Sequence, residues 1–227
     1  MTNCGTLYPD APTDFSIRVK ESVTGEAGLC IRVDCFFTVP QSVSDPIKRT
    51  WFKGDPQNPA VEVPYFSTNT FPSYEKECNF FLNHLVQGKS DGEYRLKLKW
   101  GEGKVYIFPQ TVNITVKELT QKPTIKVPLL KAGKKAEISC KVPGDCTSPM
   151  ADIVWTGIYG ETSRGGHGVP YQEENFSFMT FLPKPEHHNT KLTCAVTLQG
   201  RIRTESTVIL KVRCMYHFTY NTSSILI

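Results

Sequence analysis

Residues 90–100 read SDGEYRLKLKW, and this stretch decides the fold class of the first half of the chain. Within it an apolar set of side chains alternates with a cationic set: Tyr94, Leu96, Leu98 and Trp100 in the first, and Arg95, Lys97 and Lys99 in the second. A period of two places such sets on opposite faces of a β-strand. We therefore expect a strand whose apolar face builds a core and whose basic face meets water or a ligand.

The residues before this strand resemble the turn that leads into strand F of a variable-type immunoglobulin domain, in which a tyrosine anchors a corner. Tyr94 holds the place of that tyrosine. Two residues later such a domain normally has a cysteine that bonds to the opposite sheet, but this chain has Leu96. The usual disulfide cannot form in this half, so the placement of the eight cysteines becomes the main question.

The composition is that of an ordinary globular protein. The 227 residues are 39% hydrophobic and 21% charged, which is enough for two domains of about 100 residues each. Short alternating segments are separated by 16 prolines and 16 glycines, and no long stretch has helical periodicity. This pattern predicts an all-β fold of two β-sandwiches. The net charge of +4 is spread along the chain, which favours a solvated exterior over a nucleic-acid surface.

Several signals predict secretion. Eight cysteines without CxxC zinc spacing indicate disulfides in an oxidising compartment, and Asn113, Asn175 and Asn221 begin Asn-X-Ser/Thr glycosylation motifs. The sequence has no signal segment and no run of about 18 apolar residues. We expect a mature extracellular or cell-surface fragment that meets a membrane only through a segment absent from this chain. It has no Ser-His-Asp, phosphate-loop or metal motif, so we expect no catalysis, metal or other cofactor.

Strand phase assigns the cysteines of the first half. In the segment LCIRVDC at residues 29–35, Cys35 shares the phase of the aliphatic residues and Cys30 takes the opposite one. Cys78 shares the inward phase of its own short strand. These phases predict a Cys35–Cys78 bond inside one sheet, and they leave Cys30 pointing away from its own core. Trp51 follows at the distance at which an immunoglobulin domain packs a tryptophan against the core.

The second half repeats the immunoglobulin pattern with its usual bond. Cys140 lies on an alternating strand, Trp155 follows it, and Cys194 completes a predicted Cys140–Cys194 bond between the sheets. Cys146 lies in the turn sequence VPGDC and does not belong to that core. We therefore expect Cys146 to pair with Cys30 and to join the two domains.

The chain is expected to have four segments: an irregular lead-in at 1–11, a variable-type domain at 12–118, a constant-type domain at 119–213 and a truncated or frayed tail at 214–227. Cys4 and Cys214 are then left over near the two ends. They can pair with each other, pair between chains or stay free.

Several motifs together resemble one family, the sialic acid-binding immunoglobulin-like lectins, or Siglecs. The stretches that resemble its N-terminal variable-type (V-set) domain are ESVTGEAGLCIRVDCFF, TWFKGD, KECNFFL and DGEYRLKLKW, and those that resemble its constant-type (C2-set) domain are SCKVPGDC and FLPKPEHHNTKLTCAV. The resemblance covers residues 12–213. It includes the unusual cysteine plan, with a bond inside one sheet, no bond between the sheets of the first domain and one bond between domains.

The resemblance implies a binding surface on the outer face of strands F and G and on strand A. An arginine three residues after the strand F tyrosine pairs with the sialic acid carboxylate in this family, and its place is taken here by Lys97. A lysine offers a point charge where arginine offers a planar fork. Arg95 and Lys99 lie beside it on the expected basic face and would help to attract a carboxylate.

The remaining contacts implied by the resemblance lie on strands G and A. The strand G aromatic that packs against the glycerol arm of the sugar falls on Tyr106, and backbone groups near Ile107 and Phe108 would offer hydrogen bonds to it. The position of the strand A aromatic falls on Ser16, with Phe15 next to it. Two of the three expected side chains are thus altered or absent.

The resemblance implies a lectin-type adhesion or immune receptor that recognises terminal sialic acid on glycoproteins or glycolipids. One alternative is a receptor of the immunoglobulin superfamily that keeps this framework, has a degraded sugar site and binds a protein ligand. A soluble decoy is a third. Removal of sialic acid from target cells distinguishes the first two.

Overall fold

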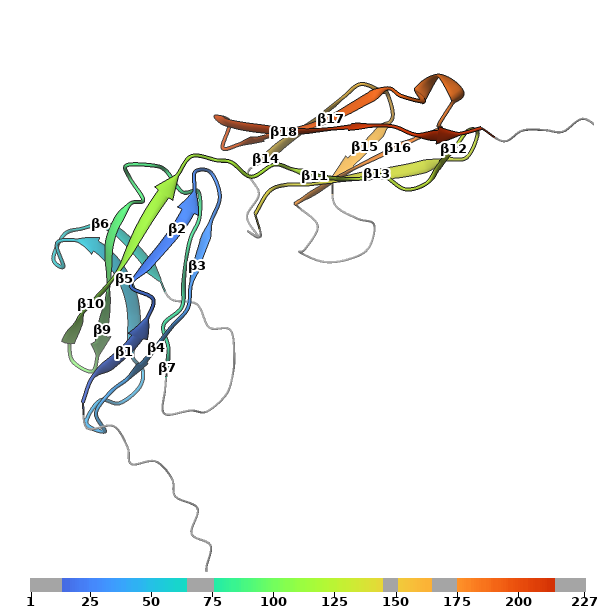
Figure 1. The fold of residues 1–227 in the computed structure, drawn as a ribbon. Coiled ribbons are helices and arrows are strands. Elements are labelled where there is room, and N and C mark those ends of the chain that lie inside the picture. Colours follow the sequence, from blue (N-terminus) through green and yellow to red (C-terminus); the bar gives the residue numbers. More distant parts are fainter. Residues whose placement is uncertain (1–13, 65–75, 145–150, 165–174, 215–227) are drawn as a thin grey trace, which may run out of the picture. The chain divides into compact units, whose positions relative to one another are not determined.

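The computed structural model of the chain describes residues 14–64, 76–144, 151–164 and 175–214. These residues form β-strands and one short 3₁₀ turn, Pro185–His187, and no helix among them is long or apolar enough to cross a membrane. The chain divides into two compact units, Met1–Leu119 and Thr120–Ile227 (Figure 1). Each is an immunoglobulin-like β-sandwich, which confirms the fold class predicted from the sequence.

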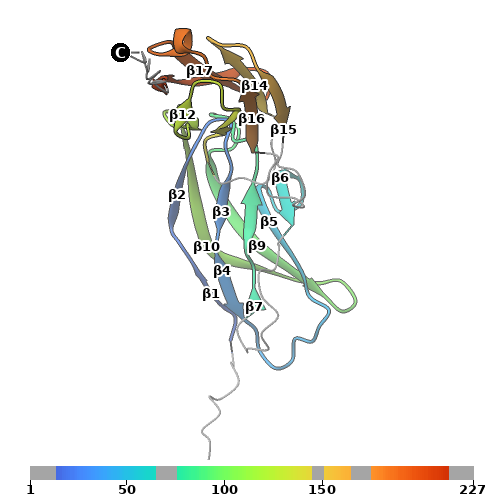
Figure 2. The same cartoon turned by 90° about the vertical axis from the view of Figure 1, so that its right-hand side faces the viewer.

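The strands described in the first unit are β1 (Ser16–Val19), β2 (Ser22–Glu26), β3 (Ile31–Val33), β4 (Cys35–Thr38), β5 (Lys48–Gly54), β6 (Pro59–Pro64), β7 (Lys76–Glu77), β8 (Phe80–Leu82), β9 (Gly92–Trp100) and β10 (Lys104–Lys117). One layer is the five-stranded sheet β2-β10-β9-β5-β6. The other layer holds β1-β4-β7 and β3-β8. The long antiparallel pair β9–β10, seen from a second side in Figure 2, forms the middle of the five-stranded sheet.

The alternation in β9 builds the core of this unit. Tyr94, Leu96 and Leu98 are fully buried in it, whereas Arg95 and Lys99 on the opposite phase are exposed. Because each neighbouring strand repeats the period of two, one side of the five-stranded sheet packs against the other layer. The opposite side, which carries the charged residues of β9, is called the outer face below.

The disulfide of the first unit joins Cys35 to Cys78, with Cα atoms 4.8 Å apart, and both cysteines belong to the layer opposite β9. This is the pairing within one sheet that strand phase predicts. The indole N–H of Trp51 donates a hydrogen bond of 2.6 Å to the carbonyl oxygen of Cys78. The Trp51 ring also packs on Phe80, with ring centroids 4.6 Å apart, so the core residue of β5 holds the disulfide region against the five-stranded sheet.

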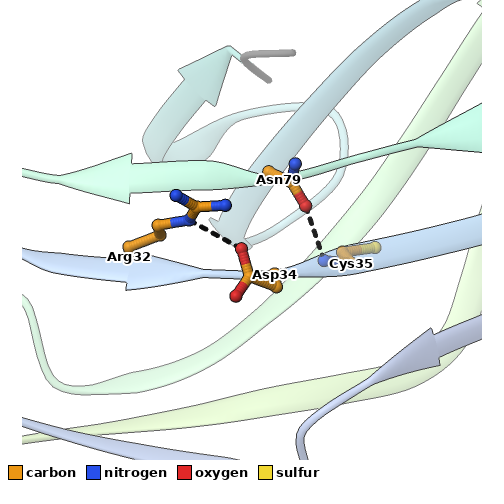
Figure 3. Close-up of polar contacts among 4 residues, drawn as sticks. All are labelled: Arg32, Asp34, Cys35 and Asn79. Carbon is orange, nitrogen blue, oxygen red and sulfur yellow. Dashed lines mark hydrogen bonds and ion pairs between the residues drawn. The ribbon is translucent and has the colours of Figure 1, made fainter. Parts of the chain in front are cut away.

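The layer that carries the disulfide is interrupted at Asp34, between β3 and β4 (Figure 3). At this break the backbone N–H of Cys35 donates a 2.9 Å hydrogen bond to the side-chain oxygen of buried Asn79. Asp34 turns to solvent and accepts a 2.7 Å bond from Arg32. The Asn79 amide therefore supplies the acceptor that a regular ladder would supply, and a buried N–H group keeps a partner.

The tyrosine corner expected from the sequence is present. The hydroxyl of Tyr94 donates a 3.0 Å hydrogen bond to the carbonyl oxygen of Ser90. In the same turn the Asp91 carboxylate accepts hydrogen bonds from the N–H groups of Gly88, at 2.6 Å, and Val116, at 2.8 Å. These bonds fix the start of β9 against the end of β10.

The strands described in the second unit are β11 (Thr124–Lys126), β12 (Leu130–Lys131), β13 (Ala136–Lys141), β14 (Ala151–Thr156), β15 (Glu161–Arg164), β16 (Phe176–Phe181), β17 (Lys191–Leu198), β18 (Ile202–Ile209) and β19 (Val212–Arg213). They form the sheets β11-β13-β16-β15 and β14-β17-β18, with β12 paired to β19. The bond Cys140–Cys194 joins β13 to β17 and so connects the two sheets. Trp155 lies opposite Cys194 in the register, as expected for an immunoglobulin core.

Of the other four cysteines, Cys30 and Cys214 lie among the described residues. Cys30 is disulfide-bonded, but the partner predicted for it, Cys146, lies outside the described residues, so that bond stays a prediction. Cys214 is exposed and free in the part of the chain that the structure describes. Cys4 also lies outside the described residues.

Candidate ligand-binding face

Register places the outward side chains of β6, β5, β9 and β10 in rows across the outer face. The three rows are Lys48, Lys99 and Val105; Pro64, Thr50, Lys97 and Ile107; and Glu62, Phe52, Arg95 and Thr111. The cations of β9 thus occupy successive rows of one face. This arrangement follows directly from the alternation in SDGEYRLKLKW.

Lys97 does not lie on an open ridge, and the expectation of an exposed cation there is wrong. Its side chain is only 8% exposed, and its ammonium nitrogen lies 3.5 Å from the Glu62 carboxylate and 3.5 Å from the Pro56 carbonyl oxygen. The same nitrogen lies 5.3 Å from the ring centroid of Phe52. Because β9 is a central strand, Phe52 of β5, Glu62 of β6 and Pro56 in the segment between them reach Lys97 from one side and enclose its ammonium.

The two flanking cations remain exposed. Arg95 lies 3.8 Å from the exposed carboxylate of Glu93 on the same strand, a contact of the kind that contributes little to stability. Lys99 lies directly opposite Lys48 in the register, and among the described residues neither has a carboxylate partner. Two like charges in adjacent strand positions repel each other, so this end of the outer face favours an anion.

Tyr106 lies on the wrong side of the sheet for the role that the resemblance implies, and this prediction is corrected. In the register Tyr106 pairs with Leu98, a core residue, whereas Lys97 pairs with Ile107. The Tyr106 ring stacks on Phe15 with centroids 3.8 Å apart and packs against the core. A shift of one residue along a strand exchanges the faces, so Ile107 is the outward neighbour of Lys97.

Phe108 belongs to the core, and its ring meets the Tyr106 ring edge-on at 5.0 Å. The pairing of β10 with β9 is interrupted after Ile107 and resumes at Thr111. The role assigned to backbone groups near Ile107 and Phe108, as donors or acceptors for a sugar, stays a prediction.

Ser16 lies in the opposite layer from Lys97. It begins β1, where its hydroxyl lies 2.7 Å from that of Thr38. The aromatic next to it, Phe15, stacks on the Tyr106 ring. The centroid of the Phe15 ring lies 5.9 Å from that of the Trp100 ring. Of the residues predicted from the sequence, the structure therefore brings Arg95, Lys97, Lys99 and Ile107 together on one face and places Ser16, Tyr106 and Phe108 elsewhere.

Sequence reasoning missed Glu62, the carboxylate closest to Lys97. Residues 53–75 are rich in Pro, Asn and Ser, which predicts variable loops, but the structure has β6 at Pro59–Pro64 within this range. The alternation Val61-Glu62-Val63 was the available signal, because it places Glu62 opposite two partly buried valines. Its proximity to Lys97 depends on the register of β5 with β6 and β9, which no sequence pattern specifies.

Two of the three glycosylation motifs lie among the described residues. Asn113 is exposed on β10, between Ser22 of β2 and Glu93 of β9. Asn175 is half-buried just before β16, and its carbonyl oxygen accepts a 2.8 Å bond from the N–H of Val142. Asn221 lies outside the described residues. Modification of these asparagines stays a prediction.

Comparison with known proteins gives no matching family model, but several similar proteins. Human sialic acid-binding Ig-like lectin 8 is 31% identical over 227 residues, and human sialic acid-binding Ig-like lectin 5 is 30% identical over 229 residues; each alignment covers 87% of this chain. The chain belongs to the Siglec family. Mouse myeloid cell surface antigen CD33 is 26% identical over 230 residues, covering 92% of this Siglec and 54% of the relative.

This Siglec chain spans only part of the proteins that it resembles. The alignments cover 38% of human sialic acid-binding Ig-like lectin 5 and 44% of human sialic acid-binding Ig-like lectin 8. The names of these relatives describe lectins and not enzymes. The role of this Siglec chain and the identity of its ligand are therefore proposed below from the residues of its own outer face.

Proposed function

We propose that this chain is the extracellular part of a cell-surface receptor that binds terminal sialic acid on glycoproteins or glycolipids without catalysing a reaction. Relatives named as sialic acid-binding lectins support the ligand class. The observation that carries the proposal is the position of three cations, Arg95, Lys97 and Lys99, on the outer face of one central strand. The middle one holds the position of the carboxylate-binding arginine in the family.

The three cations can act together on one carboxylate. Residues two apart on a strand lie about 6.5–7 Å apart, so a carboxylate that contacts one ammonium remains within the field of the next cation. Arg95 offers a planar fork and Lys97 and Lys99 offer point charges. Binding through one ammonium is weak, and clustering of receptors on a cell surface would raise the effective affinity.

The surface beside Lys97 differs from the one that the resemblance implies, since Ile107 takes the outward place expected for Tyr106. An aliphatic side chain still offers apolar contact to the carbon chain of a sugar. Val105, half-exposed in the row of Lys99, extends this apolar strip along β10.

A second candidate function is binding of a protein ligand by a receptor whose sugar site is degraded. The enclosure of Lys97 by Glu62 and the inward position of Tyr106 favour it. The exposed residues of the outer face would then contact a protein surface.

An NMR titration of the 227-residue chain with sialyllactose tests the first function. Lactose is the control ligand. We expect Lys97→Ala to abolish binding and Lys97→Arg to strengthen it, because an arginine restores the bidentate contact. Equal binding by both variants would exclude Lys97 as the carboxylate partner.

Sialidase treatment separates the two candidate functions. Cells that bind the fluorescent chain are treated with sialidase and compared with mock-treated cells. Loss of binding supports sialic acid recognition, and unchanged binding supports a protein ligand.

A further inference from the structure

Among the described residues, Glu62 supplies the carboxylate that pairs with the Lys97 ammonium. Glu62 projects from β6, and its row on the outer face, with Phe52 and Arg95, is the one next to the row of Lys97. Its side chain therefore reaches diagonally across the buried Phe52 ring to the ammonium. The Glu62 carboxylate thus occupies the place beside Lys97 that a carboxylate of a ligand would need.

The contacts of the Lys97 ammonium are long. Its nitrogen lies 3.5 Å from the Glu62 carboxylate and 3.5 Å from the Pro56 carbonyl oxygen, whereas a charge-assisted N–H···O bond is typically about 2.7–2.9 Å long. An ammonium has three N–H donors, and none of its contacts with described residues has this shorter length. A ligand oxygen that comes closer would improve the hydrogen bonding of Lys97.

Glu62 is free to leave this position. Its side chain is 49% exposed, so a rotation into water leaves its carboxylate hydrated, and the 3.5 Å separation from the Lys97 nitrogen is longer than a strong charge-assisted hydrogen bond. Lys97, in contrast, is held among β5, β6 and β9. The exchange therefore moves one flexible side chain and leaves the sheet unchanged.

We propose that Glu62 is an internal counter-ion that competes with the carboxylate of a ligand for Lys97 and so sets the affinity of the outer face for acidic sugars. The proposal rests on the function proposed above. Binding replaces one carboxylate by another on the same ammonium, with no covalent change. The apparent association constant equals the intrinsic one multiplied by the fraction of molecules in which Glu62 does not occupy Lys97.

The variant Glu62→Gln tests this proposal, because the amide keeps the size of the side chain and removes its charge. Glu93→Gln is a matched control: it removes a carboxylate from the same face, but one that lies beside Arg95. In NMR titrations with sialyllactose we expect Glu62→Gln to bind about three- to tenfold more tightly than the unmodified chain, the gain that follows if Glu62 occupies Lys97 in about two thirds to nine tenths of the molecules. Glu93→Gln should change the affinity by less than about twofold.

A second measurement is independent of sugar binding. Brief acylation with an N-hydroxysuccinimide ester, followed by peptide mass spectrometry, reports how accessible the Lys97 amine is, with Lys99 as the internal standard. We expect the ratio of Lys97 to Lys99 labelling to rise in Glu62→Gln and to stay unchanged in Glu93→Gln.

The two measurements separate the two proposals. Unchanged Lys97 labelling in Glu62→Gln, or an affinity gain no larger than that of Glu93→Gln, would overturn the role of Glu62. Increased labelling with no sialyllactose binding by any form of the chain would overturn sialic acid recognition and establish only the Glu62–Lys97 pair.

Discussion

The indole nitrogen of Trp51 lies 2.6 Å from the carbonyl oxygen of Cys78, so the core tryptophan of one layer is hydrogen-bonded to the disulfide region of the other. Across the sandwich this bond joins β5 to the segment between β7 and β8. It connects two layers that, among the disulfides of the described residues, no bond joins within the first unit.

Replacing Trp51 by Phe should therefore destabilise the first unit. The Cys78 carbonyl loses its donor inside the core, and the smaller ring leaves a gap, which together should cost about 2–4 kcal/mol in the free energy of unfolding. Urea denaturation followed by circular dichroism measures this difference. Trp100→Phe is the control, because Trp100 is only half-buried, and a loss equal to that of Trp51→Phe would contradict the prediction.

Asn79→Leu should also destabilise the first unit. Leucine is similar in size but offers no acceptor to the Cys35 N–H, and an unsatisfied buried donor costs about 1–3 kcal/mol. Asp34→Asn, which alters the exposed pair with Arg32, should change the stability by less than about 0.5 kcal/mol. The same urea experiment ranks the two variants, and similar losses for both would mean that Asn79 has no special role at the break.

The Asp91 carboxyl is expected to make part of the stability depend on pH. The hydrogen bond from the Val116 N–H holds its pKa below the usual 3.8, so the unfolded chain takes up a proton first as the pH falls. This stabilisation is complete above pH values near 3.8 and is lost as the pH falls through the lower folded-state pKa. Asp91→Asn should be less stable at pH 7 and should lose less stability on acidification. Parallel urea midpoints at pH 7 and pH 3 show whether the two curves converge, and parallel curves would exclude the effect.

Two glycines of the second unit should respond differently to substitution by alanine. Both have a positive φ, +118° at Gly157 and +76° at Gly133, but a Cβ at Gly157 would lie 2.0 Å from the Lys191 carbonyl oxygen while one at Gly133 would meet open space. We expect a loss of about 1 kcal/mol for Gly133→Ala from the backbone conformation alone, and a loss of more than about 2 kcal/mol for Gly157→Ala. Thermal unfolding by calorimetry compares the two, and equal losses would mean that the backbone at residue 191 yields easily.

Much of the fold could be predicted because it depends on local alternation. Leu96 in the place of a cysteine, together with the phase of Cys35, was enough to predict a bond within one layer, since a period of two leaves only one inward set. The tyrosine corner was likewise predictable, because Ser90 and Tyr94 lie close in sequence.

The candidate site was harder to predict for two different reasons. The inward position of Tyr106 could have been predicted, because Tyr106 shares the phase of Val112 and Ile114, both core residues. Counting positions from the family resemblance assigned it instead to the sugar-binding face. The enclosure of Lys97 could not be predicted from the sequence, because it depends on Glu62 two strands away in the sheet. Contacts between strands require a register that is set by the whole sandwich.

The Cys35–Cys78 bond has a mechanical consequence. The covalent loop that it closes contains β5 and β6, whereas β2, β9 and β10 lie outside it. If a force pulls β10 away from the rest of the sandwich, the Cys35–Cys78 bond carries none of it. The force is resisted by two rows of backbone hydrogen bonds, one between β10 and antiparallel β9 and one between β10 and parallel β2, which runs from Asn113 opposite Ser22 to Lys117 opposite Glu26.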